Sequence, residues 1–128
     1  MNKPDGSKRF CTDYRALNAV TTGSYNTAVG KSALLLATTG SNNTAVGKDA
    51  LRANNASNNT AVGMDALTAT TTGGNNTAVG YKSLSDNTTG AGNTAMGAVA
   101  GTTVTTGANN SLFGYGADYN NQGAVYPT

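Results

Sequence analysis

The chain of 128 residues contains no glutamate, no histidine and no tryptophan, and only 11% of its residues are charged. An ordinary soluble domain has about 25% charged residues. Without histidine the commonest general base and metal ligand is missing, and no histidine-activated nucleophile can form. The glycines are spread along the chain and do not form a phosphate-binding loop ahead of a helix. We therefore expect no enzyme, with no catalytic residue, no metal site and no cofactor.

Three further shortages narrow the class of protein. The single cysteine, Cys11, cannot form a disulfide within the chain, and we interpret it as a small, partly buried apolar residue, with an intermolecular disulfide as the alternative. No apolar run approaches the roughly 18 residues of a membrane span, and residues 1–9 lack the apolar core of a signal peptide. The net charge of +2 is too small to predict nucleic-acid binding. We expect neither nucleic acid nor a membrane as a partner.

What the chain has in abundance is one short phrase, Asn-Thr-Ala-Val-Gly. Six copies occur, at Asn26–Gly30, Asn43–Gly47, Asn59–Gly63, Asn76–Gly80, Asn93–Gly97 and Asn110–Gly114. The fifth has Met96 in place of valine, and the sixth reads Asn-Ser-Leu-Phe-Gly. The closing glycines are 17, 16, 17, 17 and 17 residues apart. A fixed period of this length is typical of repeat architectures, in which each repeat buries its apolar face against its neighbours.

Within each period an Ala-Leu pair and a Thr-Thr-Gly turn follow the phrase. Frequent Gly, Asn and Thr disfavour a helix, whereas Thr-Ala-Val suits a short strand and the Ala-Leu segment a second one. A coil of 17 residues has a contour of about 56 Å, which is the size of a β-solenoid rung. We predict an all-β, parallel β-solenoid (β-roll) over residues 13–117. Residues 1–12 would be an N-terminal cap or subunit-contact segment, and residues 118–128 a C-terminal cap or docking segment.

Stacked rungs place equivalent residues in vertical columns. We predict that three such columns form the structural ladder, with valine and leucine filling the rung and asparagine bonding along the stack. These residues are Asn26, Asn43, Asn59, Asn76, Asn93 and Asn110; Val29, Val46, Val62 and Val79; and Leu34, Leu51, Leu67 and Leu84. The apolar burial of one such thin rung is small beside the entropy of ordering its backbone. We therefore expect an oligomer, with a trimer or a filament favoured.

The repeats, for example Asn43 to Leu51, resemble those in the heads of trimeric autotransporter adhesins and in phage tail-fibre-like proteins. The likeness covers about residues 13–117. It implies a β-roll or β-solenoid, usually trimeric, with structural and attachment roles. On this basis we expect a non-enzymatic, self-associating building block of an extracellular fibre or appendage, located outside the cell or on a cell or virion surface, with surface glycans as a candidate attachment partner.

A second, shorter resemblance concerns residues 3–21, which are similar to a segment of Ty3/gypsy-like reverse transcriptases. The resemblance implies that Arg9 matches a nucleotide-contacting position. Polymerase chemistry needs carboxylates clustered around Mg²⁺, and the Tyr-x-Asp-Asp type of element is absent from the chain. Ala16-Leu17 and the turn at residues 21–23 already follow the 17-residue frame. We interpret the segment as non-functional in catalysis, either a recombination product that caps the solenoid or a chance likeness.

Two alternatives to a purely structural role remain open. A flat face of regularly spaced threonines could bind ice, and the candidate binding face is Thr27, Thr44, Thr60, Thr77 and Thr94. Ice binding favours two threonine columns one residue apart, and Thr-Ala-Val supplies one. Alternatively, the module binds or carries glycans: Asn-x-Ser/Thr acceptors occur at Asn42, Asn55, Asn58, Asn75, Asn87 and Asn109, and Asn42, Asn58, Asn75 and Asn109 share a column. We interpret Lys31, Lys48 and Lys82 as solvated edge charges.

Overall fold

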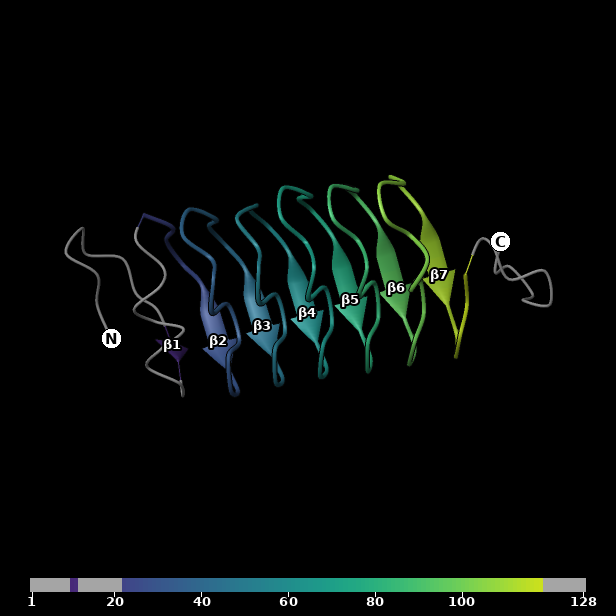
Figure 1. Cartoon of the computed structure of the whole chain (residues 1–128), viewed down its shortest axis with the longest axis horizontal. Coiled ribbons are helices and arrows are strands. Elements are labelled where there is room, and N and C mark those ends of the chain that lie inside the picture. The colour runs from purple at the N-terminus through teal and green to yellow at the C-terminus, as the bar shows by residue number, and fades with distance from the viewer. Residues whose placement is uncertain (1–9, 12–21, 119–128) are drawn as a thin grey trace.

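The computed structural model describes residues 10–11 and 22–118, which form a single stack of coils (Figure 1). Seven short strands lie side by side along the long axis: β1 (Phe10–Cys11), β2 (Thr27–Val29), β3 (Thr44–Val46), β4 (Thr60–Val62), β5 (Thr77–Val79), β6 (Thr94–Met96) and β7 (Ser111–Phe113). All neighbours are parallel, in the order β1 to β7. The predicted all-β, parallel β-solenoid is confirmed.

The sequence period sets the strand register. Thr27 pairs with Thr44, Ala28 with Ala45 and Val29 with Val46, and the same pairing continues through the following rungs. Strand β1 pairs in the same way, one rung ahead of β2. The sheet thus includes two residues of the segment 1–12 that was assigned to a cap or subunit contact. The remaining predictions for residues 1–9, 12–21 and 119–128 lie outside the described part of the chain.

Each described rung from β2 onward contains one strand, and the predicted second strand at the Ala-Leu pair is wrong. The segment after each corner glycine is a chain of turns. Its backbone enters the left-handed region twice, for example at Asp49 (φ 58°) and Leu51 (φ 49°). An extended strand needs negative φ at every residue, so the Ala-Leu segment cannot pair as a strand. Within residues 10–11 and 22–118, no helix is long and apolar enough to cross a membrane.

The interior of the coil is narrow and filled by alanine and leucine. The central alanine of each strand is buried, as are the Ala-Leu pairs of the opposite segment, and Leu51 and Leu67 have no exposed surface. The valine column stacks in register as predicted, but the prediction that it fills the rung is wrong. Val29, Val46 and Val79 are half-buried and Val62 is 37% exposed. Alternate side chains of a strand face opposite sides, so an inward alanine directs both threonine and valine outward.

The corner glycine that ends each strand is required by its surroundings. At Gly63 φ is +135°, and a Cβ there would lie 2.5 Å from the carbonyl oxygen of Gly80 in the next rung. Neither the backbone conformation nor the space admits a side chain. The strict glycine period therefore reflects the close approach of successive rungs at this corner.

The last rungs depart from the pattern in a compensating way. Gly101 replaces leucine in the column of Leu84, and Leu112 replaces alanine in the strand column. A Cβ on Gly101 would lie 2.8 Å from Leu84 Cδ2 and 3.0 Å from Leu112 Cδ1. The two leucines thus occupy the volume that a leucine at 101 would take. Asp118, in the next position of this column, is buried and accepts hydrogen bonds from the Thr103 backbone N–H (2.8 Å) and hydroxyl.

Candidate functional site: the columns of the solenoid surface

The asparagine column is a continuous, buried hydrogen-bonded ladder. The side-chain oxygen of Asn76 accepts from the backbone N–H of Asn93 at 2.8 Å, and its Nδ2 donates to the carbonyl of Gly90 at 2.8 Å. The same pair of bonds recurs at Asn26, Asn43, Asn59 and Asn93. Each side chain therefore ties its rung to two places in the next rung. This geometry matches the predicted structural ladder and leaves the amides unavailable to a ligand.

The 16-residue rung keeps its turn although alanine stands in place of the turn glycine. Asn43 Nδ2 donates to the carbonyl of Ala56 at 2.8 Å, so Ala56 occupies the place of the turn glycine. Asn54 is not among the residues with positive φ. Instead its buried side chain accepts from the Ala56 N–H at 3.1 Å and donates to the Ala56 carbonyl at 2.8 Å. Side-chain hydrogen bonds of asparagine stabilise this turn.

The threonine column lies on the outer face of the sheet. Thr27, Thr44, Thr60, Thr77 and Thr94 are all half-buried and stand in register. None of their hydroxyls bonds to another described residue. The threonines of the Thr-Thr-Gly turns differ, because several donate to carbonyls of the following rung; Thr71 and Thr88 do so at 3.2 Å. The candidate binding face is thus the threonine column with unpaired hydroxyls.

The candidate glycosylation column is exposed. Asn42, Asn58, Asn75 and Asn109 all point to solvent from a left-handed corner with φ between 59° and 65°. Asn42 Nδ2 donates to Asn58 Oδ1 at 3.3 Å, so adjacent side chains are close enough to touch. Of the other two acceptor sequences, Asn55 is exposed and Asn87 has no exposed surface. Asn87 is therefore inaccessible in the folded chain.

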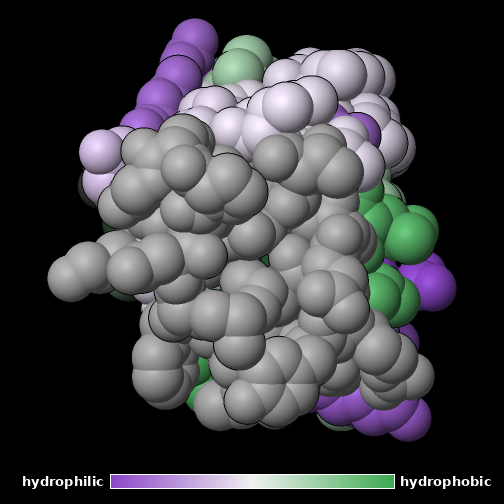
Figure 2. All heavy atoms as spheres, turned by 90° about the vertical axis from the view of Figure 1, so that its left-hand side faces the viewer, coloured by the Kyte–Doolittle hydropathy of each residue, from purple (hydrophilic) through white to green (hydrophobic). Residues whose placement is uncertain are grey.

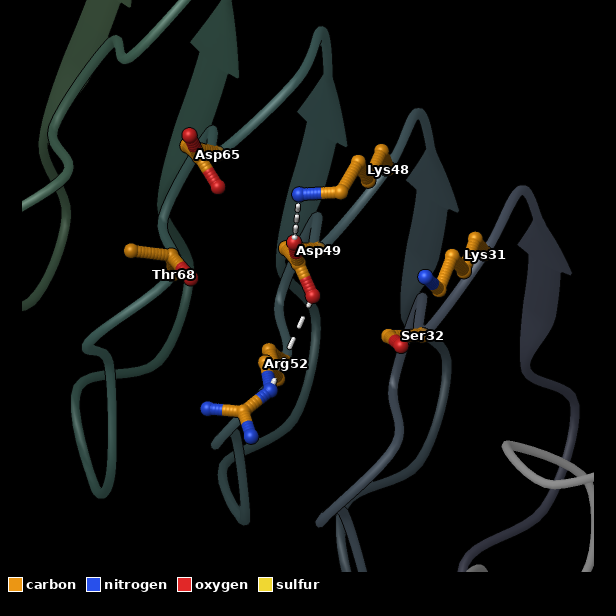
Figure 3. A pocket seen from close by; sticks show the side chains of 7 residues that line it. All are labelled: Lys31, Ser32, Lys48, Asp49, Arg52, Asp65 and Thr68. Carbon is orange, nitrogen blue, oxygen red and sulfur yellow. Dashed lines mark hydrogen bonds and ion pairs between the residues drawn. The ribbon is translucent and has the colours of Figure 1, made fainter.

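Charged side chains of three successive rungs line a shallow groove of about 380 Å³ (Figure 3). Asp49 lies between two cations, 2.6 Å from Lys48 Nζ and 3.6 Å from Arg52 Nε. The hydrogen bond and the charge of Asp49 raise the pKa of Lys48. Lys31 and Asp65 lie on opposite sides of the Lys48–Asp49 ion pair. The opposite charges largely compensate one another, so this groove offers no concentrated site for an anion.

Five of the exposed large apolar residues lie where the strands of the later rungs end, whereas Tyr25 and Leu36 are exposed elsewhere. Met96 and Phe113 take the valine position, and Met64, Tyr81 and Tyr115 directly follow a corner glycine. All five are more than two-fifths exposed, and Tyr115 reaches 85%. We call these five residues the apolar edge. Figure 2, viewed along the stack, shows hydrophobic atoms mainly on one flank, beside hydrophilic ones.

The sequence analysis did not identify the apolar edge, although its signal is present in the repeat. Each of its residues falls in the valine column or immediately after the corner glycine. A comparison of side-chain size along these two columns would have identified it. In the first full rungs the position after the glycine holds Lys31 and Lys48. Lys82 follows Tyr81, and its ammonium lies 5.5 Å from the centre of the Tyr81 ring.

The described residues contain no group of acidic, cysteine or histidine side chains that could hold a metal ion. The chain matches no protein-family model, no curated protein and no solved structure.

Proposed function

We propose that this chain is a non-enzymatic structural protein, a β-solenoid that self-associates into an oligomer or filament of an extracellular fibre or appendage. The apolar edge carries this proposal. Its residues extend from the rung of Met64 to that of Tyr115, parallel to the stack axis. Contiguous exposed apolar surface is uncommon on monomeric proteins and marks interaction sites.

A second copy is the occupant that the repeat geometry supports. The edge follows the axis, so two or three copies aligned along their axes would bury it over its whole length. Methionine, tyrosine and phenylalanine are enriched at the centres of protein interfaces, where charged residues are depleted. A trimer or filament held in this way would supply the burial that the narrow interior of one coil lacks. Attachment to surface glycans would then be a property of the assembled rod.

The proposal is tested by light scattering on size-separated protein and by electron microscopy. We expect defined oligomers or rods from the native chain. The double variant Tyr81→Ser, Phe113→Ser should shift the population to monomer without loss of the β-sheet circular dichroism signal. Tyr25→Ser is the matched control, because Tyr25 is 67% exposed but lies before its strand, away from the edge. A native chain that stays monomeric at micromolar concentration would refute the proposal.

A further inference from the structure

The outer face of the sheet carries two regular columns of side chains across β2 to β5. One column is Thr27, Thr44, Thr60 and Thr77, and the other is Val29, Val46, Val62 and Val79. They are separated by the inward alanine and pair in register from rung to rung. We call these eight residues the Thr–Val face. The sequence predicts a single threonine column here, and the structure adds the valine column to the same face.

The hydroxyls of this face are free to bind a ligand. Those of Thr44, Thr60 and Thr77 bond to no described residue. Elsewhere in the coil the threonine hydroxyl is used internally, as at Thr70, which donates to the Asn87 carbonyl at 3.0 Å. A row of hydroxyls with unused donors and acceptors presents hydrogen-bonding groups at each rung, about 4.8 Å apart. The face therefore has a built-in translational repeat.

The face is also rigid before anything binds. Threonine and valine are both branched at Cβ, which restricts χ1, and seven of the eight are half-buried, Val62 being the exposed one, which restricts χ1 further. The backbone beneath is held by the parallel ladder and by glycine corners that admit no side chain. A preorganised surface loses little conformational entropy on binding. Neither column contains a charged residue, so the face is matched to an uncharged ligand.

We propose that the Thr–Val face binds the surface of ice. Ice is an uncharged lattice of hydrogen-bond donors and acceptors with a short, fixed repeat. The threonine hydroxyls hold water molecules in a row, while the valine methyl groups limit the orientations of the water between the columns. Bridging waters ordered in this way are nearly as favourable as direct hydrogen bonds. The Thr–Val face shares no residue with the apolar edge, although Met96 and Phe113 of the edge continue its valine column in β6 and β7.

The test measures thermal hysteresis and the partition of the protein into a slowly growing ice crystal. We expect the native chain to show both, and the double variant Thr44→Tyr, Thr60→Tyr to lose both, because the rings would rise above the face. Thr72→Tyr is the matched control, since Thr72 is an exposed threonine of the turn, away from the sheet. It should retain the native activity. If the double variant does not melt cooperatively, the single change Thr77→Tyr replaces it.

Two results would overturn the inference: a native chain that ice excludes, or a Thr72→Tyr variant that loses as much activity as the face variant. The monomeric edge variant Tyr81→Ser, Phe113→Ser is measured in parallel. Hysteresis in that variant supports the Thr–Val face even if the native chain never assembles. Absence of hysteresis from both the assembled and the monomeric protein refutes ice binding and leaves self-association standing.

Discussion

Removal of one ladder amide, by Asn76→Ala, should destabilise the whole stack. Asn76 is fully buried near the middle of the solenoid. Its side chain donates to the Gly90 carbonyl and accepts from the Asn93 N–H, each at 2.8 Å. Alanine can do neither. The variant would leave the Asn93 N–H unpaired, whereas the Gly90 carbonyl would keep the hydrogen bond that it accepts from Asn87 Nδ2 at 3.0 Å.

The magnitude follows from these two groups. The Asn93 N–H loses its partner, which costs about 1–3 kcal/mol, and the lost second bond to the Gly90 carbonyl adds about 0.5–1.5 kcal/mol, for a total of about 1.5–4.5 kcal/mol. The whole free energy of unfolding of a domain is about 5–15 kcal/mol. At about 4 °C per kcal/mol for a chain of this size, the melting temperature should fall by about 6–18 °C. Because each rung contacts only its neighbours, the loss in the middle should also reduce cooperativity.

The assay is thermal unfolding followed by circular dichroism, with amide hydrogen exchange at Asn93 as a local readout. Asn75→Gly is the control, because Asn75 is adjacent, exposed and at φ 61°, a conformation that glycine adopts readily. It should change stability by no more than about 0.5 kcal/mol. If Asn76→Ala melted within a few degrees of the control and left the Asn93 exchange rate unchanged, the amide ladder would not be holding the rungs together.

Three other predictions test the packing. Val46→Asp should lower the free energy of unfolding by no more than about 1 kcal/mol, because the Val46 side chain faces outward. Ala45→Asp buries an unpaired charge and should lower it by about 3–5 kcal/mol. Equal losses for the two variants in urea unfolding would contradict the assigned orientation of the strand. Gly63→Ala should cost more than about 2 kcal/mol from its φ and from the clash with the next corner glycine, and a melting temperature equal to the native one would exclude this account. Leu112→Ala should cost about 2–5 kcal/mol by opening a cavity. Added Gly101→Leu should restore part of that loss, with a coupling energy of about 0.5–3 kcal/mol in a double-mutant cycle, and strict additivity would show that the two positions do not share a volume.

Much of the fold could be predicted from the period alone. In a solenoid, equal spacing makes equal residues neighbours, so the repeat of Asn43, Asn59 and Asn76 already indicates a buried ladder along the stack. The recurring corner glycine likewise predicts a place where only hydrogen fits, as Gly63 shows. These features depend on one residue type in one column, which a sequence displays directly.

The candidate surfaces were harder to predict, because they depend on which way each strand faces. Thr60-Ala61-Val62 contains two apolar residues and one polar residue, and both inward valine and inward alanine are consistent with alternation. Valine is the better core residue by size, and that favoured the wrong assignment. The apolar edge was missed for a related reason: Tyr81 follows a glycine, outside the strand that the pattern identified.

By itself, then, the sequence determined the parallel stack, its register, the asparagine ladder and the glycine corners, because each follows from periodicity and from side-chain chemistry that has one solution. Only the tertiary structure decided that each full rung has one strand and that alanine faces inward. Leu51 and Leu67, held by a left-handed turn, project into a narrow coil and leave room for no more than a methyl group opposite them. That constraint directs threonine and valine outward together, which forms the Thr–Val face and also exposes Met96 and Phe113 of the apolar edge.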